Sequence, residues 1–577
     1  MEAPQSAVAP LNPNPASPAV AEADPNRWPP QIKYIVGNEA AERFSYYGVR
    51  GILSLYITGA LLQTDNRATT IIHMFVFVNY FMPLLGAYVS ERWWGRYHTI
   101  LWISLFYCAG HGVMATSDLF HTVDGKLNCL YVGLGLIAFG SGGIKPCVSA
   151  FMGDQFRADQ AHLMRKAYSV FYFSINFGSI FSFLVIPWIA KTPAPQLVAD
   201  AGFVDQILWQ LKHAGFSGYS WAFGVPGIAM ALATLVFWLG TKHYTRKPPN
   251  RATQTAGFFK VFLAAFANLP KGNPGLTVTA VVSVLTSIVL PLLTMIGMVY
   301  VGFRHDVTPA VKSLARISLG CMGLWYLLVL ITSVLRKAEL PDLFWAGARG
   351  RFKDAEIAAA RSVSPILAVL GLLPAFWALY DQSMSTWVLQ GKKLVEFQFL
   401  TLNVQAEQMQ SLNALLILIL VPIFAWGLYP WIERRGLQVT ALRRMSLGFV
   451  FTVLSFLVVA WLQKRLEAGE QVSLKWQAIP YLFLTIGEVL ISTTGLEFAY
   501  TQALPSMKST IMGFFLLSVA IGNLIVTTIT QLLGQKGDEA VTSERFFLYA
   551  LLATGVGVLF IIIAVSYRYR DLRQTVT

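Results

Sequence analysis

The chain has 577 residues, of which 55% are hydrophobic and 13% are charged, and its mean hydropathy is +0.54. These values lie outside the range of soluble globular domains, so they exclude a water-soluble fold and indicate that lipid surrounds most of the chain. The formal net charge of +14 raises the alternative of a nucleic-acid partner, which the distribution of charge along the chain must decide.

Residues 1–30 differ from the rest, because they are rich in proline, alanine and small polar residues and contain no apolar run. We interpret them as a disordered tail. The tail has neither the basic start nor the apolar stretch of a signal peptide, so we expect the first span to direct insertion.

Apolar segments long enough to cross a bilayer recur along almost the whole remaining chain. A hydrocarbon core roughly 30 Å thick requires about 20 apolar residues per helix. Fourteen segments meet this requirement, at residues 34–61, 69–90, 98–117, 128–151, 167–190, 219–240, 275–302, 313–335, 364–390, 410–430, 441–463, 477–500, 511–534 and 546–567. The sequence therefore predicts an all-α polytopic membrane protein with 14 transmembrane helices. The four cysteines lie in or beside these segments without metal-ligand or paired spacing, so we predict packing roles for them and no metal site.

Basic residues crowd alternate loops, whereas the intervening loops mix both signs. The basic loops lie at residues 92–96, 157–166, 242–251, 336–353, 434–444 and 568–573. The positive-inside rule then places both termini in the cytoplasm and makes the number of spans even, in a cell (inner) membrane. A nucleic-acid groove would instead need stacking aromatics in soluble segments, so we predict no nucleic-acid partner.

The long basic stretches divide the chain into two similar halves. Residues 31–245 hold six spans, and residues 364–577 hold another six and a short basic tail. Residues 246–363 form a cytoplasmic linker into which a two-helix hairpin is inserted. Two six-helix halves that hold substrate between them near the midplane are a known transporter plan.

The first span carries the densest set of ionisable residues, in the segment GNEAAERFSYYGVR. Glu39, Arg43, Tyr46 and Arg50 are spaced at i, i+4, i+7 and i+11, and Glu42 lies one turn from Glu39, so the five form one polar stripe on a helix. A charge at this depth costs about 2.5–3.5 kcal/mol on insertion scales, so such residues usually face a cavity or a partner. A carboxylate balanced between desolvation and a guanidinium can carry a proton. The alternative is a static ion pair that fixes helix packing.

Three further ionisable residues inside predicted spans are candidates for function. Lys145 is in a glycine-rich segment, too deep to reach the interface, and Pro146 is expected to weaken the helix there. Glu488 lies in the middle of its span. His73 lies in the second span, and an ordinary imidazole pKa of about 6.5 lets it exchange protons near neutral pH. A histidine satisfied by its neighbours is the alternative.

Several long motifs occur in a fixed order along the chain. The first span reads ExxERFxYYG, and GAYVSERWWGRY, GSGGIKPCVSAFMGDQF, FYFSINFGS, FWALYDQ and GEVLISTTGLEFAY follow. In these motifs the sequence resembles the proton-dependent oligopeptide transporter family over essentially everything after residue 30, with motifs close to mammalian-type peptide transporters. The resemblance implies the major facilitator fold, with two six-helix bundles and two extra helices between them.

The resemblance also implies a substrate site shared by the two halves. Arg43 and Lys145 would bind the peptide carboxylate, and two cations on one carboxylate suit a site where water is scarce. Glu488 would bind the peptide ammonium group. The further substrate-binding residues that it implies are Tyr46, Tyr47, Tyr80, Asn176, Trp377 and Asn413. Taken alone, a buried asparagine is more often a helix–helix contact, and aromatics at helical spacing are more often packing.

Proton coupling is implied for Glu39, Glu42, Arg43 and His73, although many members of the family lack the histidine. Arg50 and Asp381 would form an extracellular gate, since both lie toward the outer ends of their spans. One departure from the family pattern affects gating. Thr493 follows Ser492 where bacterial members commonly have proline, so the helix is less obviously broken there.

The sequence and the resemblance together predict proton-coupled symport of di- and tripeptides, and of peptidomimetics, into the cell by alternating access. The proton is the coupling ion, no other cofactor is expected, and the protein is expected to act as a monomer. No catalytic constellation is present, so an enzyme is not predicted. A carrier of nitrate or another anion with the same fold is the alternative, but it should not need Glu488. A polyspecific drug carrier is compatible with the same residues, whereas a channel would need a selectivity filter.

Overall fold

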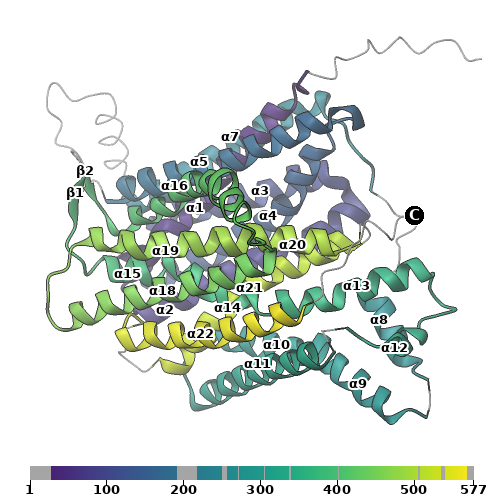
Figure 1. The fold of residues 1–577 in the computed structure, drawn as a ribbon. Coiled ribbons are helices and arrows are strands. Elements are labelled where there is room, and N and C mark those ends of the chain that lie inside the picture. The colour runs from purple at the N-terminus through teal and green to yellow at the C-terminus, as the bar shows by residue number, and fades with distance from the viewer. Residues whose placement is uncertain are drawn as a thin grey trace, which may run out of the picture.

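The computed structural model describes residues 27–191, 217–249, 257–270, 272–304, 306–336, 339–399, 402–504, 507–534 and 540–567. The predicted N-terminal tail, up to residue 26, and the basic C-terminal tail, from residue 568, lie outside the described residues. The described chain is predominantly helical, as predicted (Figure 1). It also contains a two-stranded antiparallel hairpin, β1 (Phe397–Phe399) and β2 (Leu402–Val404), which the sequence did not predict.

Six long helices form the N-terminal half. They are α1 (Ile32–Leu55), α2 (Asp65–Val89), α3 (Gly95–Ala115), α4 (Val123–Gly153), α5 (Ala161–Lys191) and α7 (Gly218–Leu239). Hydroxyl side chains cap three of them: Thr64, Thr122 and Ser217 each accept a hydrogen bond from a backbone N–H of the first turn of α2, α4 and α7. Such caps satisfy donors that the helix itself leaves free.

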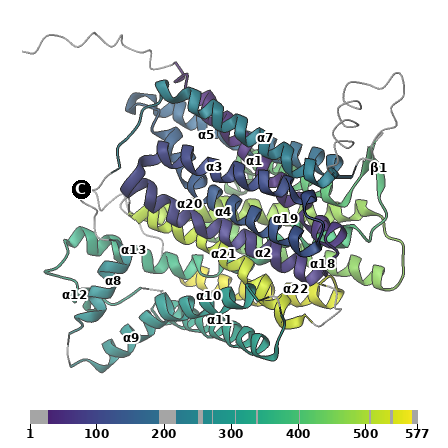
Figure 2. The same cartoon turned by 180° about the vertical axis from the view of Figure 1, so that it is seen from behind.

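The linker contains the inserted hairpin and two short helices. Its elements are α8 (Phe258–Ala267), α9 (Pro274–Val284), α10 (Leu290–Gly302), α11 (Pro309–Arg336) and α12 (Asp342–Ala346). A π-helical stretch, Leu285–Val289, joins α9 to α10. The short helices pack through aromatic rings, with Phe262 centred 5.3 Å from Phe344. Figures 1 and 2 show α10 and α11 side by side along one edge of the bundle, with α8 and α12 at one end of the pair.

The helices of the C-terminal half are more often interrupted. They are α13 (Asp354–Leu370), α14 (Leu373–Tyr380), α15 (Thr386–Gly391), α16 (Ser411–Pro422), α17 (Tyr429–Glu433), α18 (Ala441–Glu467), α19 (Ala478–Glu488), α20 (Thr494–Gln502), α21 (Lys508–Leu533) and α22 (Ser543–Ser566). The predicted span 364–390 is not one straight helix, because the chain bends by 43° after α13. Asp381, between α14 and α15, is buried in the interior.

By length and hydropathy, eleven helical stretches of the described chain could cross a membrane, or twelve if α13 to α15 count as one bent span. This count does not confirm the predicted fourteen. It treats residues 65–115 as one stretch of 51 residues. At 1.5 Å per residue that stretch is about 76 Å long, far more than one bilayer core, and Gly95 breaks it with a φ of 73°. It also leaves out α1, whose buried charges lower its hydropathy. Fourteen spans therefore stay a prediction.

The buried apolar side chains fall into two main clusters. One draws all its members from residues 32–244, and the other draws most of its members from residues 258–563. The halves meet where α2 packs along α21 and where α5 packs along α16. The predicted division of the chain into two halves agrees with these clusters. The exact boundaries at residues 245 and 363 stay a prediction.

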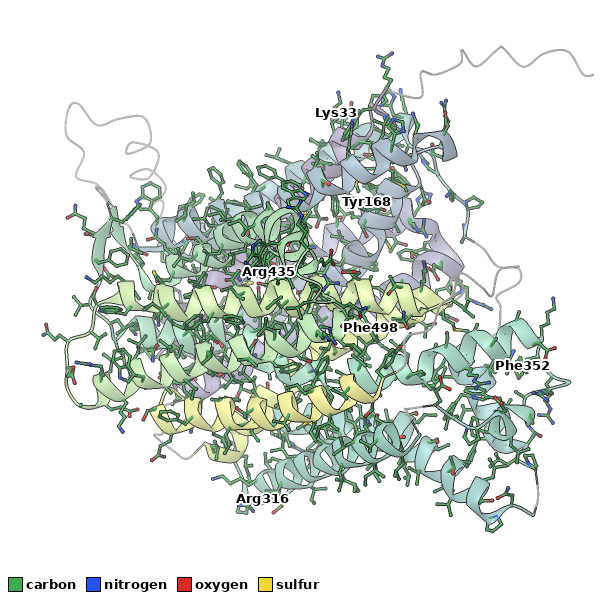
Figure 3. The ribbon with its side chains drawn as sticks, in the orientation of Figure 1. Lys33, Tyr168, Arg316, Phe352, Arg435 and Phe498 are labelled. Carbon is green, nitrogen blue, oxygen red and sulfur yellow. The ribbon has the colours of Figure 1, made fainter. Side chains whose placement is uncertain are left out.

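The two ends of the bundle can be told apart by their elements. We call the end at which α1 ends and α2 begins, and beside which the β hairpin lies, the β1–β2 end. Figure 3 shows Phe352, before α13, well to the right of Arg316, which is near the start of α11, and it shows Lys33, near the start of α1, far above Arg316 and also to its right. The inserted hairpin thus turns toward the β1–β2 end and returns the chain to the end from which α1 and α13 start.

Candidate functional site

Arg43 contacts both carboxylates of the α1 stripe. The Nε atom of Arg43 lies 2.7 Å from Oε1 of Glu39 and 2.9 Å from Oε2 of Glu42. The side chains of Glu39 and Glu42 are 4% and 0% exposed, and that of Arg43 is 11% exposed. Two carboxylates therefore share one guanidinium where water scarcely reaches, so Arg43 alone cannot neutralise both when both are ionised.

Lys145 of α4 brings a second cation to the N-terminal half. Its Nζ atom lies 4.1 Å from the ring centre of Tyr46 and 4.6 Å from that of Tyr80. The Nζ atom is buried and has no hydrogen-bond acceptor among the described residues. Cation–π attraction, about 2 kcal/mol when desolvated, holds the ammonium group but leaves its N–H donors open to an anion.

Close helix packing places Lys145 against these rings. A Cβ atom on Gly142 would lie 2.4 Å from a side-chain atom of α2, and one on Gly143 would lie 2.6 Å from a side-chain atom of α3. A larger residue at either position would force the helices apart. α4 continues through Pro146 without a break, although the proline lacks the N–H that would donate the next hydrogen bond of the helix. Neighbouring helices support proline within a membrane helix.

Glu488 lies at the centre of a hydrogen-bonded group in the C-terminal half. Asn413 donates from Nδ2 to Oε2 of Glu488 over 2.7 Å and lies 3.1 Å from Oγ1 of Thr485. The hydroxyl of Tyr380 donates to Oδ1 of Asn413 over 3.2 Å. No lysine or arginine of the described chain forms an ion pair with Glu488. Asn413, predicted as a substrate ligand, is here the residue that orients Glu488.

The helix that carries Glu488 is interrupted immediately after it. α19 ends at Glu488, and a π-helical stretch over Val489–Thr493 leads to α20. The sequence predicted a less clearly broken helix, because Thr493 takes the place of proline. The chain does stay helical from Leu474 to Ala499, as expected, although its hydrogen-bond pattern becomes π-helical over Val489–Thr493. π-helical turns within α-helices often occur at functional sites.

The other predicted substrate residues lie on both halves. Tyr47 packs against Phe183 of α5, with ring centres 5.3 Å apart, and it interacts electrostatically with Arg43 and with Glu488. Tyr47 is thus within electrostatic range of one charge from each half. Asn176 donates to a backbone carbonyl of its own helix over 3.0 Å, so its helix orients it. Trp377 is 8% exposed and packs against aromatic rings of α14 and α21.

Arg50 and Asp381 form a buried ion pair across the two halves, and each side chain is 2% exposed. The second carboxylate oxygen of Asp381 accepts a hydrogen bond from Asn523 over 2.6 Å. The Nδ1 atom of His73 lies 2.7 Å from Oδ1 of Asn523, and its Nε2 atom lies 2.9 Å from the hydroxyl of Ser385. A continuous polar chain therefore links His73 to the ion pair.

Sequence reasoning missed Asn523 and Ser385. Asn523 is the polar residue in the apolar segment AIGNLIV. A polar residue at that depth indicates a buried partner or a functional site, so the sequence did contain a signal for it. It also passed over His111, which is buried in α3 with Nδ1 3.1 Å from a carbonyl oxygen of α7. That histidine bonds within its own half, away from the ion pair.

Further contacts join the halves at the β1–β2 end. Lys191, the last residue of α5, lies 2.6 Å from the carboxylate of Glu407, which is 1% exposed. Gln410 donates to the carbonyl of Gly51 over 3.2 Å. At the opposite end, ion pairs form within a half, between Arg96 and Asp154, Lys247 and Asp154, and Arg444 and Glu497. The halves are thus held together at the β1–β2 end.

Comparison with known proteins adds three kinds of similarity: to a family model, to a curated relative and to solved structures. The model of the POT family matches residues 97–544. The human protein solute carrier family 15 member 1 is 32% identical over 476 residues, which cover 80% of this chain and 55% of that protein. The chain therefore spans about half the length of the curated relatives that it matches.

Two solved structures match a larger share of the chain than this relative does. The in meso crystal structure of the POT family transporter PepTSo is 37% identical, with a TM-score of 0.77, over 94% of this chain and 99% of that one. An auto-inhibited POT family peptide transporter is also 37% identical, with a TM-score of 0.73, over 94% and 98%. Together with the matched residues 97–544, these similarities show that the chain belongs to the POT family.

Proposed function

We propose that the chain is a symporter that uses protons to carry di- and tripeptides into the cell. The observation that carries this proposal is one charge in each half that forms no ion pair among the described residues, Nζ of Lys145 and the carboxylate of Glu488. The terminal carboxylate and ammonium of a short peptide would complete both groups at once. A relative of 37% identity is named a peptide transporter, which supports the same substrate class.

Proton coupling is assigned to the trio of Glu39, Glu42 and Arg43. Because two buried carboxylates share one guanidinium, a single proton removes the excess negative charge, and the proton belongs to the pair rather than to one residue. His73 is a second candidate, since its hydrogen bonds connect it to Asp381 through Asn523. No cofactor other than the proton takes part in this scheme.

Alternating access requires the contacts at the β1–β2 end to open. In this proposal that end faces outward, both termini are cytoplasmic, and the protein works as a monomer in the cell (inner) membrane. Arg50 and Asp381 are then the extracellular gate, and Lys191 with Glu407 forms a second bond that breaks when the gate opens. Peptide leaves from the opposite end after the gate has closed.

Glu488 argues against the anion alternative. A site for nitrate would place a carboxylate that lacks a cationic partner near a second negative charge, and this repulsion disfavours binding. A zwitterion avoids it. Peptidomimetics keep both charges and fit the same residues, so they are expected substrates. Nothing in the proposed scheme makes or breaks a covalent bond, so the protein is a transporter and not an enzyme.

Uptake of labelled dialanine into liposomes that hold the purified full chain tests the proposal. An inside-negative potential and a pH gradient are imposed separately and removed with an uncoupler. Proton-coupled transport predicts accumulation that collapses with the uncoupler. Glu42→Gln should abolish accumulation but keep exchange of peptide down its own gradient. If no short peptide enters with both gradients verified, the peptide proposal is wrong.

The role of Glu488 has a sharper test. Glu488→Gln should weaken competition by dialanine at least about thirtyfold, because a desolvated charge pair contributes about 2–5 kcal/mol. N-acetyl-dialanine lacks the ammonium group, so the substitution should change its competition little. Glu470→Gln is the matched control, since that acid is 45% exposed and pairs with Arg465 at the surface. Equal losses for both peptides would contradict the assignment.

A further inference from the structure

A cavity of about 860 Å³ lies apart from the proposed substrate site. Its walls come from three parts of the chain: α2 and α4 of the N-terminal half, α21 of the C-terminal half, and the turn between α10 and α11. Figure 2 shows α10 alongside α21. None of the predicted substrate, coupling or gate residues lines it. Its volume is within the usual range of ligand sites, about 300–1,000 Å³.

The inner part of this cavity is apolar. Met74, Val78, Leu134 and Ala138 line it there. Val78 is thirteen residues along α2 from Asp65, which corresponds to about 20 Å at 1.5 Å per residue. The apolar part therefore reaches to about the middle of a hydrocarbon core roughly 30 Å thick. Water has few polar partners at that depth, so an apolar chain suits the space better.

The part nearest the β1–β2 end is polar and mostly cationic. Arg67, Arg304 and Lys312 line it, against a single acid, Asp306. The Nε atom of Arg67 is buried and has no hydrogen-bond acceptor among the described residues. Three cations and one acid favour a negatively charged group at this level, and a guanidinium binds phosphate and carboxylate well.

We propose that this cavity binds an amphiphile with one anionic head and an apolar tail, the chemistry that anionic phospholipids and free fatty acids share. The head lies among Arg67, Arg304 and Lys312, and the tail extends between α2 and α4. Since the cavity has walls from both halves, its occupant contacts both of them while the β1–β2 end is held together. It therefore stabilises that closed state relative to the open one.

Native mass spectrometry of the full chain in detergent tests this site. Phosphatidylglycerol, phosphatidylcholine with the same acyl chains, oleic acid and glycerol 3-phosphate are titrated separately. We expect binding of phosphatidylglycerol, of oleic acid, or of both, weaker binding of phosphatidylcholine, and no binding of glycerol 3-phosphate, which has no tail. The first and third ligands distinguish a membrane lipid from a free fatty acid.

Variants locate the binding. Gly135 lines the cavity, and a Cβ atom there would meet nothing within 4 Å, so Gly135→Phe fills the space without a clash at the backbone. It should abolish binding, whereas Gly555→Phe, at an equally open glycine of α22, should not. The double variant Arg67→Gln/Lys312→Gln should weaken the binding of phosphatidylglycerol about fivefold for each charge removed. Lys475→Gln, an exposed lysine elsewhere, is the charge control.

Two outcomes would overturn the proposal. One is binding of phosphatidylcholine to the unchanged chain that is as strong as the binding of phosphatidylglycerol and of oleic acid. The other is binding to the Gly135 and Arg67/Lys312 variants that matches the unchanged chain, which would mean that the lipid sits elsewhere on the surface. The charge variant keeps the test decisive even if Gly135→Phe lowers the yield of folded protein.

Discussion

Asp381→Leu should open the β1–β2 end of the bundle. In the unchanged chain Asp381 forms a buried ion pair with Arg50 and accepts a hydrogen bond from Asn523. The substitution leaves the guanidinium of Arg50 buried without its carboxylate while the end stays closed. In an open state that guanidinium regains water, so the substitution destabilises the closed state selectively.

The size of the effect follows from the burial of the pair. Both side chains are 2% exposed, and removing one partner of such a pair costs about 3–5 kcal/mol. At about 1.4 kcal/mol for each factor of ten, the closed-to-open ratio falls by about a hundredfold to several thousandfold. A state that is strongly favoured in the unchanged chain would then become the minor one.

Distances between two spin labels measure this shift. Leu119, after α3, and Phe399, on β1, are 63% exposed each and lie on different halves near the β1–β2 end. Both are replaced by labelled cysteine in a chain whose four native cysteines, all free, are changed to alanine. Pulsed electron paramagnetic resonance should show a longer distance as the main population after Asp381→Leu.

The double variant Arg50→Met/Asp381→Leu decides whether the buried charge is the cause. Replacing a whole buried pair by apolar residues of similar volume is often neutral or stabilising, so the short distance should return. Arg465→Gln is the control, because its partner Glu470 is 45% exposed and such surface pairs contribute about 0–1 kcal/mol. A single variant with an unchanged distance, or a double variant as open as the single one, would refute the reasoning.

Three further predictions concern single residues. Lys145→Met should weaken competition by dialanine for uptake at least about thirtyfold, because it removes a desolvated cation. Competition by a peptide with an amidated C-terminus should change little. Lys191→Gln should open the β1–β2 end less than Asp381→Leu does in the same distance measurement, since Lys191 is 31% exposed although Glu407 is buried. Partial burial alone would raise the pKa of Asp118, but hydrogen bonds, one of them from Ser220 over 2.7 Å, outweigh it and lower that pKa. The stabilisation from Asp118 is thus present above the ordinary pKa of about 3.9 and is lost as pH falls through the lowered value. Asp118→Asn should therefore lower the melting temperature at pH 7. It should also make the melting temperature depend less on pH in the acid range.

Local geometry explains what could be predicted from the sequence. Apolar runs of about 20 residues predict membrane helices because the bilayer sets their length, and the described chain has helices over nearly all of them. The contact between Glu39 and Arg43 was also accessible, since residues four apart lie on the same face of any α-helix. Family membership could likewise be read from motifs whose order and spacing are visible in the chain.

Tertiary structure decided which partners these residues have, because the register of one helix against another depends on packing over many side chains and not on spacing within either helix. The rings over Lys145 come from α1 and α2, and Asn413, not a cation, bonds Glu488. Asn523 lies 450 residues from His73 in the chain but 2.7 Å from it in space. Within helices, packing also lets α4 continue through Pro146. The sequence by itself thus determined that charged residues lie within the membrane spans, and the packing of the two halves determined which of them form ion pairs.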